Sequence, residues 1–297
     1  MQTASPDIRL VYRADNYLGE SPVWCPRTGS LYWINCQPDP CLFRLLESSG
    51  EVQRWPMPER IGAVILCADG GLIVALARGL HRFDIDSGEL QLLAKSPDAD
   101  SVYLHEGKCD RQGRLWIGSL THAMMLRGET GGGNFYRLDG DCLEPVITDI
   151  SVSNGLAWSP DGKTLYCTDT PRNVIWAYDY DTATGTVTNR RDFAVIAAAD
   201  GRPDGAAVDA EGGYWTTLFQ GGCLRRYAAN GAIDRELRLP FSTPTMLAFG
   251  GENLDRIYLT TTRHRMSRDE LAATPEIGGL FCLDSAIRGL PEPLYRG

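Results

Sequence analysis

The clearest pattern of hydrophobic and polar positions in this chain is a phrase that recurs six times. Each copy has a small residue, an alternating apolar strand, a turn that carries Asp, Pro or Gly, and a second strand rich in Tyr, Trp and Leu. The copies are SPVWCPRTGSLYWIN from Ser21, GAVILCADGGLIVAL from Gly62, GKCDRQGRLWIGSL from Gly107, GLAWSPDGKTLYCTDT from Gly155, GAAVDAEGGYWTTL from Gly205 and TMLAFGGENLDRIYLTTT from Thr245. Their starts are separated by 41, 45, 48, 50 and 40 residues.

This spacing, with several short strands in each repeat, is typical of the blades of a β-propeller. The hairpin turns have matching chemistry, since Pro160 presets the backbone of its turn and Gly162 accepts a positive φ. The segments between the phrases, such as those that begin at Gly79 and Val174, supply two more strand candidates. We therefore predict an all-β, six-bladed β-propeller with four antiparallel strands per blade.

The last blade is one strand short unless another part of the chain completes it. After the sixth phrase the sequence offers only GGLFCLDS and EPLYRG. We expect residues Ile8 to Ala14 to pair with this blade, because closing the ring removes exposed sheet edges. No Pro/Gly/Ser-rich linker, charge block or low-complexity stretch interrupts the pattern, so residues 1–297 are predicted to form a single propeller domain.

Composition narrows the possible partners. The 297 residues are 43% hydrophobic and carry a formal charge of -9 without any run of Lys or Arg, so neither nucleic acid nor an anionic membrane surface is an expected partner. The longest apolar runs have the length of a strand, and we expect no membrane span. The nine cysteines form no C-x-x-C pair, which favours reduced thiols in a cytoplasmic protein.

The residue before each phrase occupies the same place in every blade. Because the innermost strand of a blade runs along the central channel, these positions are predicted to form one ring, which we call the channel ring. Its members are Glu20, Ile61, Glu106, Asn154, Asp204 and Pro244, with Arg60 and His105 beside two of them. Clustered carboxylates repel one another, and oxygen-rich sets suit Ca²⁺, Mg²⁺ or Mn²⁺. Alternatively, these side chains cap strand starts and bond to their own turns.

Several of the phrases also resemble a known family. LGESPVW from Leu18, SNGLAWSPDGKTLYCTDT from Ser153 and RPDGAAVDAEGGYWTTL from Arg202 resemble motifs of the gluconolactonase and regucalcin (senescence marker protein) family. The resemblance implies a six-bladed propeller that binds one divalent metal ion, with Ca²⁺, Zn²⁺, Mn²⁺ and Fe²⁺ all open. It implies Glu20, Asn154 and Asp204 as the metal ligands, and Asp204 as the residue that handles the proton.

One segment departs from the family pattern. Where many members have R-F-N-D-G-K, this chain has YLHEGK from Tyr103, which removes the Arg and Asn that make the usual sugar-acid contacts. His105 could bond to substrate or water at the rim, or it could be a fourth metal contact that favours Zn²⁺, Mn²⁺ or Fe²⁺ over Ca²⁺. Asn35 is a second departure, since relatives often have Asp there. The residues expected to contact substrate are Arg60, Tyr103, His105, Glu106 and His122.

The expected reaction is the hydrolysis of a sugar lactone to its sugar acid. Three protein ligands leave positions on a metal ion for substrate and water, and Asp204 can accept the proton. Neither a G-x-S-x-G elbow nor an H-E-x-x-H motif is present to suggest a different hydrolase. Two alternatives are a propeller phosphoesterase or organophosphatase that uses the same metal, and a non-enzymatic calcium-binding regulatory propeller. We expect a monomer, because the site needs no second subunit.

Overall fold

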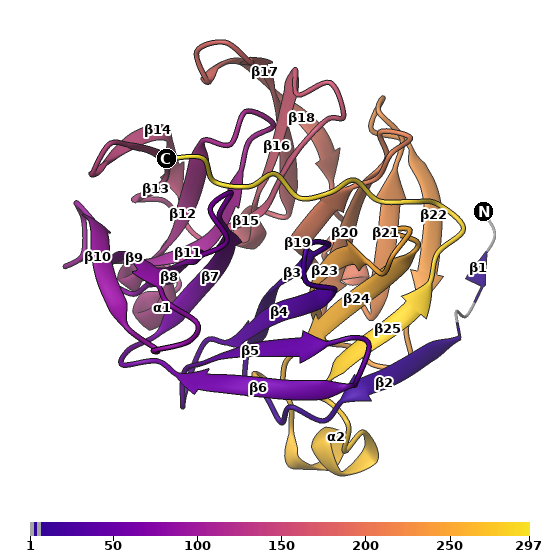
Figure 1. Ribbon diagram of the computed structural model, residues 1–297. Coiled ribbons are helices and arrows are strands. Elements are labelled where there is room, and N and C mark those ends of the chain that lie inside the picture. The colour runs from indigo at the N-terminus through magenta and orange to yellow at the C-terminus, as the bar shows by residue number, and fades with distance from the viewer. Residues whose placement is uncertain (1–2, 5–6) are drawn as a thin grey trace.

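The computed structural model describes residues 3–4 and 7–297, and the strands within them form six sheets around a central channel (Figure 1). The innermost strands contact one another in order around that channel. They are β3 (Gly19–Cys25), β7 (Ile61–Leu66), β11 (Val102–Cys109), β15 (Ser153–Trp158), β19 (Arg202–Val208) and β23 (Pro244–Gly250). Each begins one blade, so the predicted six-bladed propeller is confirmed.

Three further antiparallel strands complete each blade in the predicted order. The second strands are β4 (Ser30–Asn35), β8 (Leu72–Leu76), β12 (Leu115–Thr121), β16 (Thr164–Asp169), β20 (Tyr214–Phe219) and β24 (Arg256–Thr261). The third strands are β5 (Cys41–Leu46), β9 (Gly79–Phe83), β13 (Gly133–Asp139), β17 (Val174–Asp181), β21 (Cys223–Tyr227) and β25 (Leu280–Asp284). The outer strands are β6 (Glu51–Pro56), β10 (Leu90–Lys95), β14 (Cys142–Ile150), β18 (Thr186–Val195), β22 (Ile233–Arg238) and the N-terminal β2 (Ile8–Tyr12).

The N-terminal strand closes the ring as expected. β2 pairs antiparallel with β25, with Leu10 opposite Phe281, so the first and last parts of the chain share the sixth blade. It ends at Tyr12 rather than Ala14, and the chain then turns at Asp15, whose φ is 55°. An unpredicted strand, β1 (Thr3–Ala4), lies parallel to β22 and makes the fifth blade five-stranded.

Large aromatic side chains pack between neighbouring blades, as their positions at the hairpin ends predict. Trp24 stacks on Tyr258 of the sixth blade, with ring centroids 6.0 Å apart. Trp116 of the third blade meets Trp158 of the fourth edge-on at 6.0 Å. Side-chain packing thus joins the sheets, together with a few backbone hydrogen bonds such as that from the Thr121 amide to the Ser151 carbonyl.

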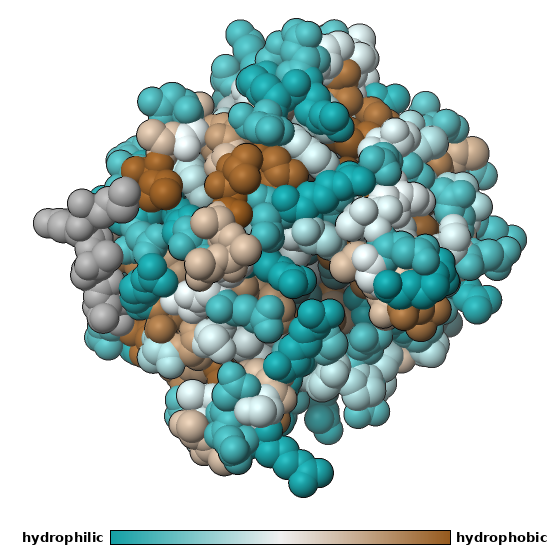
Figure 2. Space-filling view, turned by 180° about the vertical axis from the view of Figure 1, so that it is seen from behind, coloured by the Kyte–Doolittle hydropathy of each residue, from teal (hydrophilic) through white to brown (hydrophobic). Residues whose placement is uncertain are grey.

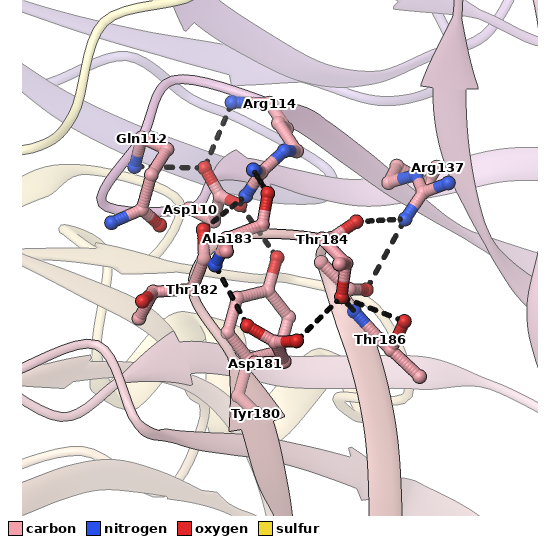
Figure 3. A network of polar contacts seen from close by, with 11 residues as sticks. Asp110, Gln112, Arg114, Arg137, Tyr180, Asp181, Thr182, Ala183, Thr184 and Thr186 are labelled. Atoms are coloured by element: carbon pink, nitrogen blue, oxygen red, sulfur yellow. Dashed lines mark hydrogen bonds and ion pairs between the residues drawn. The ribbon is translucent and has the colours of Figure 1, made fainter.

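A buried carboxylate strengthens the junction between the third and fourth blades (Figure 3). Asp110, in the turn between β11 and β12, accepts hydrogen bonds from the backbone of Gln112 and Arg114 and from the hydroxyl of Tyr180 at 2.5 Å. The Arg114 guanidinium pairs with the same carboxylate at 2.8 Å and also donates to two carbonyl oxygens of the β17–β18 turn. Asp110 thus fixes its own β11–β12 turn directly, and it contributes to fixing the β17–β18 turn through Arg114.

The C-terminal segment, residues 285–297, crosses one mouth of the channel and was not predicted to do so (Figure 1). It bonds to the inner hairpin turns of three blades, through Ala210 to Arg288, Ala68 to Tyr295 and Arg296 to Gly113. Glu292 of this segment lies 3.4 Å from the amine of Lys108, which also donates to the Ala206 carbonyl inside the channel. This mouth is covered by the end of the chain.

Four short helical segments follow strands or connect them. They are the α-helices α1 (His122–Arg127) and α2 (Arg268–Ala273), and the 3-10 turns η1 (Thr170–Arg172) and η2 (Ala198–Asp200). Within the described ranges, neither α-helix is long and apolar enough to cross a membrane. The face away from the C-terminal segment shows scattered apolar patches among hydrophilic groups (Figure 2).

Replacement of Asp110 by Ala should destabilise the propeller by about 3 kcal/mol, because it removes a fully buried carboxylate that accepts four hydrogen bonds. The free energy of unfolding in urea measures the loss. Asp181→Ala is the matched control from the same network, because Asp181 is exposed, and it should cost less than about 1 kcal/mol. Equal losses in the two variants would contradict this account of the junction.

Candidate metal centre

Every innermost strand has a β-bulge near its start. The register with the second strand slips by one residue between Glu20 and Val23, and the other five inner strands slip at the equivalent place. Those slips lie at Ile61/Ala63, Leu104/Gly107, Asn154/Ala157, Pro203/Ala206 and Pro244/Leu247. An extra residue in one strand bends it and re-aims its side chains. The predicted channel ring therefore coincides with a ring of bulges.

Bulged residues leave peptide groups without a partner in their own sheet, and neighbouring blades supply some of the missing bonds. The Ser21 hydroxyl accepts from the Val64 amide of the second blade at 3.0 Å. The Tyr214 hydroxyl of the fifth blade donates to the Gly155 carbonyl at 2.8 Å. Thr245 donates to the Gly19 carbonyl at 2.6 Å and so links the sixth blade to the first. These bonds hold the inner strands in register around the channel.

Three carboxyl groups of the channel ring influence one another electrostatically. Glu20 is 6% exposed and Asp204 is 8% exposed, so little water reaches either group. Burial raises the pKa of Glu20 well above its ordinary value, and the charges of Asp204 and Glu106 raise it further. Burial and the charge of Glu106 likewise raise the pKa of Asp204. The structure thus brings together the acids that the repeat pattern placed on one ring.

Asn154 is oriented by a neighbour outside the ring. Its side-chain amide donates to the Thr170 hydroxyl at 2.9 Å, and that hydroxyl donates to the Pro203 carbonyl at 2.8 Å. With the amide nitrogen engaged, the Asn154 oxygen is the atom left to act as a ligand. Thr170 thus connects Asn154 to the residue that precedes Asp204. The sequence analysis missed Thr170, whose only signal is its place directly after β16.

Glu106 combines a structural contact with an unused oxygen. Its Oε1 accepts from the Leu156 amide at 3.1 Å, which ties the third blade to the fourth. Its Oε2 is buried without a hydrogen-bond partner in the described structure. Burial raises the pKa of Glu106 to about 8, although Lys108 and the backbone amides of Leu156 and Gly155 act in the opposite direction. A group of this kind can exchange a proton near neutral pH.

The donor chemistry of Glu20, Asn154 and Asp204 fits a hard divalent cation. Two carboxylates and one amide supply only oxygen ligands, and no Lys or Arg among the described residues forms an ion pair with either carboxylate. Considered by themselves, the His, Cys, Asp and Glu side chains of the described residues contain no group of three or more arranged for a metal ion. The predicted ligand set, Glu20, Asn154 and Asp204, is not of this type, because it has only two such side chains and its third ligand is the amide of Asn154.

Two of the predicted rim residues lie deeper than expected. Arg60 is 8% exposed and His105 is 6% exposed, so both are enclosed in the channel wall rather than displayed on an open rim. The second and third blades are close here, since a Cβ on Gly62 would lie 2.8 Å from the His105 Cα. Burial, together with the charge of Arg60, lowers the pKa of His105 to about 3. His105 is therefore neutral at neutral pH.

Tyr103 and His122 lie nearer to the surface, and their rings are in contact at an interplanar angle of 55°. Their ring centroids are 4.2 Å apart, and both side chains are partly exposed. The Tyr103 ring also faces the Arg60 guanidinium, whose carbon lies 5.8 Å from the ring centroid. The structure thus brings Arg60, Tyr103 and His122 into one cluster, as the sequence predicted. It adds a pair that the sequence analysis missed, Tyr17 and His264, which are hydrogen bonded at 2.9 Å.

Asn35, the second departure from the family pattern, has a structural explanation. Its Oδ1 accepts from the Leu18 amide at 3.0 Å, and its Nδ2 donates to the carbonyls of Pro38 and Asp39. A carboxylate could not make the two donations. The residue therefore fixes the chain just before Glu20, and it does so through an amide.

Comparison with known proteins agrees with this arrangement. Residues 18–263 match the family described as the SMP-30/Gluconolactonase/LRE-like region, a span that includes Glu20, Asn154 and Asp204. The chain belongs to the SMP-30/gluconolactonase/LRE-like family. The family expected from the three motifs is thereby confirmed.

Relatives of this family member include named lactonases. The chain is 38% identical over 294 residues to a 6-deoxy-6-sulfogluconolactonase of Pseudomonas putida, covering 98% of this chain and 99% of that protein. It is 33% identical over 302 residues to an L-arabinolactonase of Azospirillum brasilense, covering 100% and 99% of the two chains. The crystal structure of a calcium-binding protein, regucalcin, from Agrobacterium tumefaciens matches with a TM-score of 0.93 and 29% identity over the whole of both chains.

The stability of the metal-free protein should fall as pH rises from about 5 to about 8. Because the pKa of Glu106 is raised from 4.5 to about 8 in the folded state, its contribution is fully present below the ordinary pKa and is lost as pH approaches 8. Each such group changes the free energy of unfolding by about 1.4 kcal/mol per pH unit within this window. Urea unfolding in the presence of a chelator, repeated across the pH range, measures the slope.

Glu106→Gln should reduce this slope while keeping an oxygen for the Leu156 amide. The remaining slope comes from Glu20 and Asp204, whose pKa values are also raised. Glu252→Gln is the control, because Glu252 is an exposed glutamate outside the channel, and its slope should equal that of the wild type. If Glu106→Gln leaves the slope unchanged, Glu106 is already ionised in the folded protein.

Proposed function

We propose that this protein is a metal-dependent hydrolase that opens a sugar lactone to its sugar acid. The observation that supports the proposal is that Glu20, Asn154 and Asp204 are buried at equivalent bulges of three blades, and that among the described residues neither carboxylate forms an ion pair with Lys or Arg. Buried carboxylates without such a partner are stabilised by a bound cation. The curated lactonases among its relatives support lactone opening as the reaction.

The three residues would hold one divalent ion through oxygen atoms. Such an ion supplies Lewis acidity for an ester carbonyl and lowers the pKa of water. Thr170 keeps the Asn154 amide turned so that its oxygen is available, and Asn35 fixes the backbone that leads to Glu20. The name of the regucalcin structure, a calcium-binding protein, makes Ca²⁺ one candidate, alongside Zn²⁺, Mn²⁺ and Fe²⁺.

The chain's own groups can complete the proton transfers of lactone opening. Water adds to the carbonyl carbon, the bond from that carbon to the ring oxygen breaks, and the ring oxygen ends as a hydroxyl. Asp204, as a carboxylate, is assigned to accept the proton of the attacking water. Neutral His105 can donate a hydrogen bond to a substrate oxygen, because its Nδ1 is buried with no partner in the described structure.

The substrate contacts are assigned to the cluster above the ring. Contacts among Arg60, Tyr103 and His122 support this assignment, and the buried His105 and Glu106 are assigned to the same group. All of these residues come from one chain, and all nine cysteines are free thiols, so the proposal is for a monomeric cytoplasmic enzyme. The names of the relatives cover a sulfonated lactone and an arabinolactone, which leaves the sugar to be determined.

Removal of the metal ion should abolish lactone opening. We expect protein stripped by a chelator to be inactive and to regain turnover when Ca²⁺, Zn²⁺, Mn²⁺ or Fe²⁺ is supplied, with acid release followed by a pH indicator. Asp204→Asn and Glu20→Gln should each lose at least about 100-fold in kcat, which corresponds to about 2.7 kcal/mol of barrier. Asp192→Asn removes an exposed carboxylate of β18 and should retain full activity.

Four outcomes decide against the proposal. Turnover that survives complete removal of metal, or full activity of Asp204→Asn, rejects the assigned site. Hydrolysis of an aryl phosphoester but of no aldonolactone identifies a phosphoesterase. Tight calcium binding without any turnover identifies a non-enzymatic binding protein.

Thr170→Val should weaken metal binding about 10-fold or more, because it removes the partner that orients the Asn154 amide. Thr170→Ser keeps the hydroxyl and should bind metal as the wild type does. Titration of the metal-free protein with Ca²⁺ or Mn²⁺ by calorimetry measures both affinities without relying on activity. Equal affinity of the valine variant and the wild type would show that Asn154 needs no such support or is not a ligand.

A further inference from the structure

The side chain of Arg60 is buried with its charge uncompensated. It is 8% exposed, and its Nε, Nη1 and Nη2 atoms are all buried without a hydrogen-bond partner. Within the part of the chain that the structure describes, no carboxylate lies close enough to form an ion pair with it. The tyrosine face at 5.8 Å is its one described stabilising contact. Burial of a guanidinium whose five N–H donors are unpaired destabilises the folded protein.

The carboxylates of the channel ring do not account for this cost. Burial, Asp204, Glu106 and a backbone hydrogen bond each affect the pKa of Glu20 more than Arg60 does. Lys108 is the cationic side chain that lowers the pKa of Glu106, and Arg60 is not among the main causes of its shift. Under the proposed function, Glu20 and Asp204 also offset the charge of the metal ion. The positive charge of Arg60 is therefore left for something that enters the channel.

The surroundings of Arg60 form a site with further hydrogen-bonding groups. The Tyr103 ring faces the guanidinium and also contacts the tilted ring of His122, whose Nε2 is buried without a partner in the described structure. His105, within electrostatic reach of Arg60, has a buried Nδ1 that is also without a partner. These groups come from the second and third blades and share one side of the channel. Together they can surround an anion and bond to the atoms next to it.

We propose that the physiological substrate is a lactone that carries an anionic group remote from its ester, and that Arg60 binds this anion. The inference rests on the proposed function, because it takes the ester end of the lactone to lie at the channel ring. A sulfonate, a phosphate and a carboxylate share the chemistry that a guanidinium recognises, which is two oxygens accepting a pair of parallel N–H bonds. A sugar hydroxyl could accept one bond but would leave the charge unbalanced in a buried place.

The test compares anionic and neutral lactones of the same ring. The substrates are D-glucono-1,5-lactone, its 6-phosphate and its 6-deoxy-6-sulfonate, with glucaro-lactone as the carboxylate. We expect the wild type to prefer at least one anionic lactone over the neutral one by 10-fold or more in kcat/KM, chiefly through a lower KM. The member of the series with the highest kcat/KM identifies which anion the site takes.

Arg60→Met should remove this preference. The loss in kcat/KM should be at least 10-fold larger for the preferred anionic lactone than for the neutral lactone, so that the ratio between them approaches one. Arg60→Lys keeps the positive charge but lacks the pair of parallel N–H donors, so it should retain part of the preference for the anionic lactone. Arg78→Met is the matched control, since Arg78 is an exposed arginine of the same blade, and the ratio should stay at the wild-type value. Thermal unfolding of each variant confirms that it is folded.

Two results overturn the inference while leaving the proposed function in place. One is a wild type that opens neutral and anionic lactones equally well. The other is an equal loss for both substrates in Arg60→Met, which assigns Arg60 to balancing the carboxylates of the channel ring.

A binding measurement covers the case in which no lactone is opened and the proposed function itself fails. Calorimetry with 6-phosphogluconate and 6-deoxy-6-sulfogluconate, compared with gluconate, tests the anion site without turnover, since all three share the C1 carboxylate. Either acid with a second anionic group should bind more tightly than gluconate, and this difference should disappear in Arg60→Met. Such a result supports the anion site independently of turnover. No difference between gluconate and both of the others rejects it.

Discussion

The close approach of six inner strands around one channel governs the rest of this structure. At Gly62 a Cβ atom would lie 2.4 Å from the Leu104 carbonyl oxygen, and at Gly205 it would lie 2.3 Å from a side-chain carbon of Met246. Contacts this short exclude larger residues unless the backbone moves. Ser21 stands at the equivalent position of the first blade with φ of 49°, a conformation that is strained for a residue other than glycine. Its hydroxyl offsets part of that strain by accepting the Val64 amide.

The same close approach of the inner strands buries carboxyl groups near one another, which destabilises their ionised forms and favours binding of a cation. Strands that meet in this way carry Glu20, Glu106 and Asp204 into a space with little water, where burial penalises their ionised forms. A propeller built only for stability would place apolar side chains there, as it does at Ile61. Acidic residues at three other positions reduce the stability of the metal-free chain, and such a cost is typical of functional sites.

The fold and the channel ring could be predicted because both follow from repetition. One phrase fixes the inner hairpin of each blade, so superposing six copies places Glu20, Asn154 and Asp204 at equivalent points without any knowledge of the packing. Contacts between blades carry no such local signal. Thr170 bonds to Asn154 and to the Pro203 carbonyl across two blades, and Tyr17 meets His264 from opposite ends of the chain. Arg60 and His105 were placed beside the ring correctly, but their burial depends on the neighbouring strand.

The path of the C-terminal segment could not be predicted for a similar reason. It forms single bridges to the inner turns rather than a strand of regular pattern, with Tyr295 beside Cys67 and Gly289 beside Asp209. The path of this segment affects how a small molecule can reach the channel ring. The segment bonds to the turns that follow β7, β11 and β19, so it lies at the opposite end of these strands from the channel ring. A small molecule is therefore expected to approach the ring from the mouth where the inner strands begin, and not from the mouth that this segment crosses.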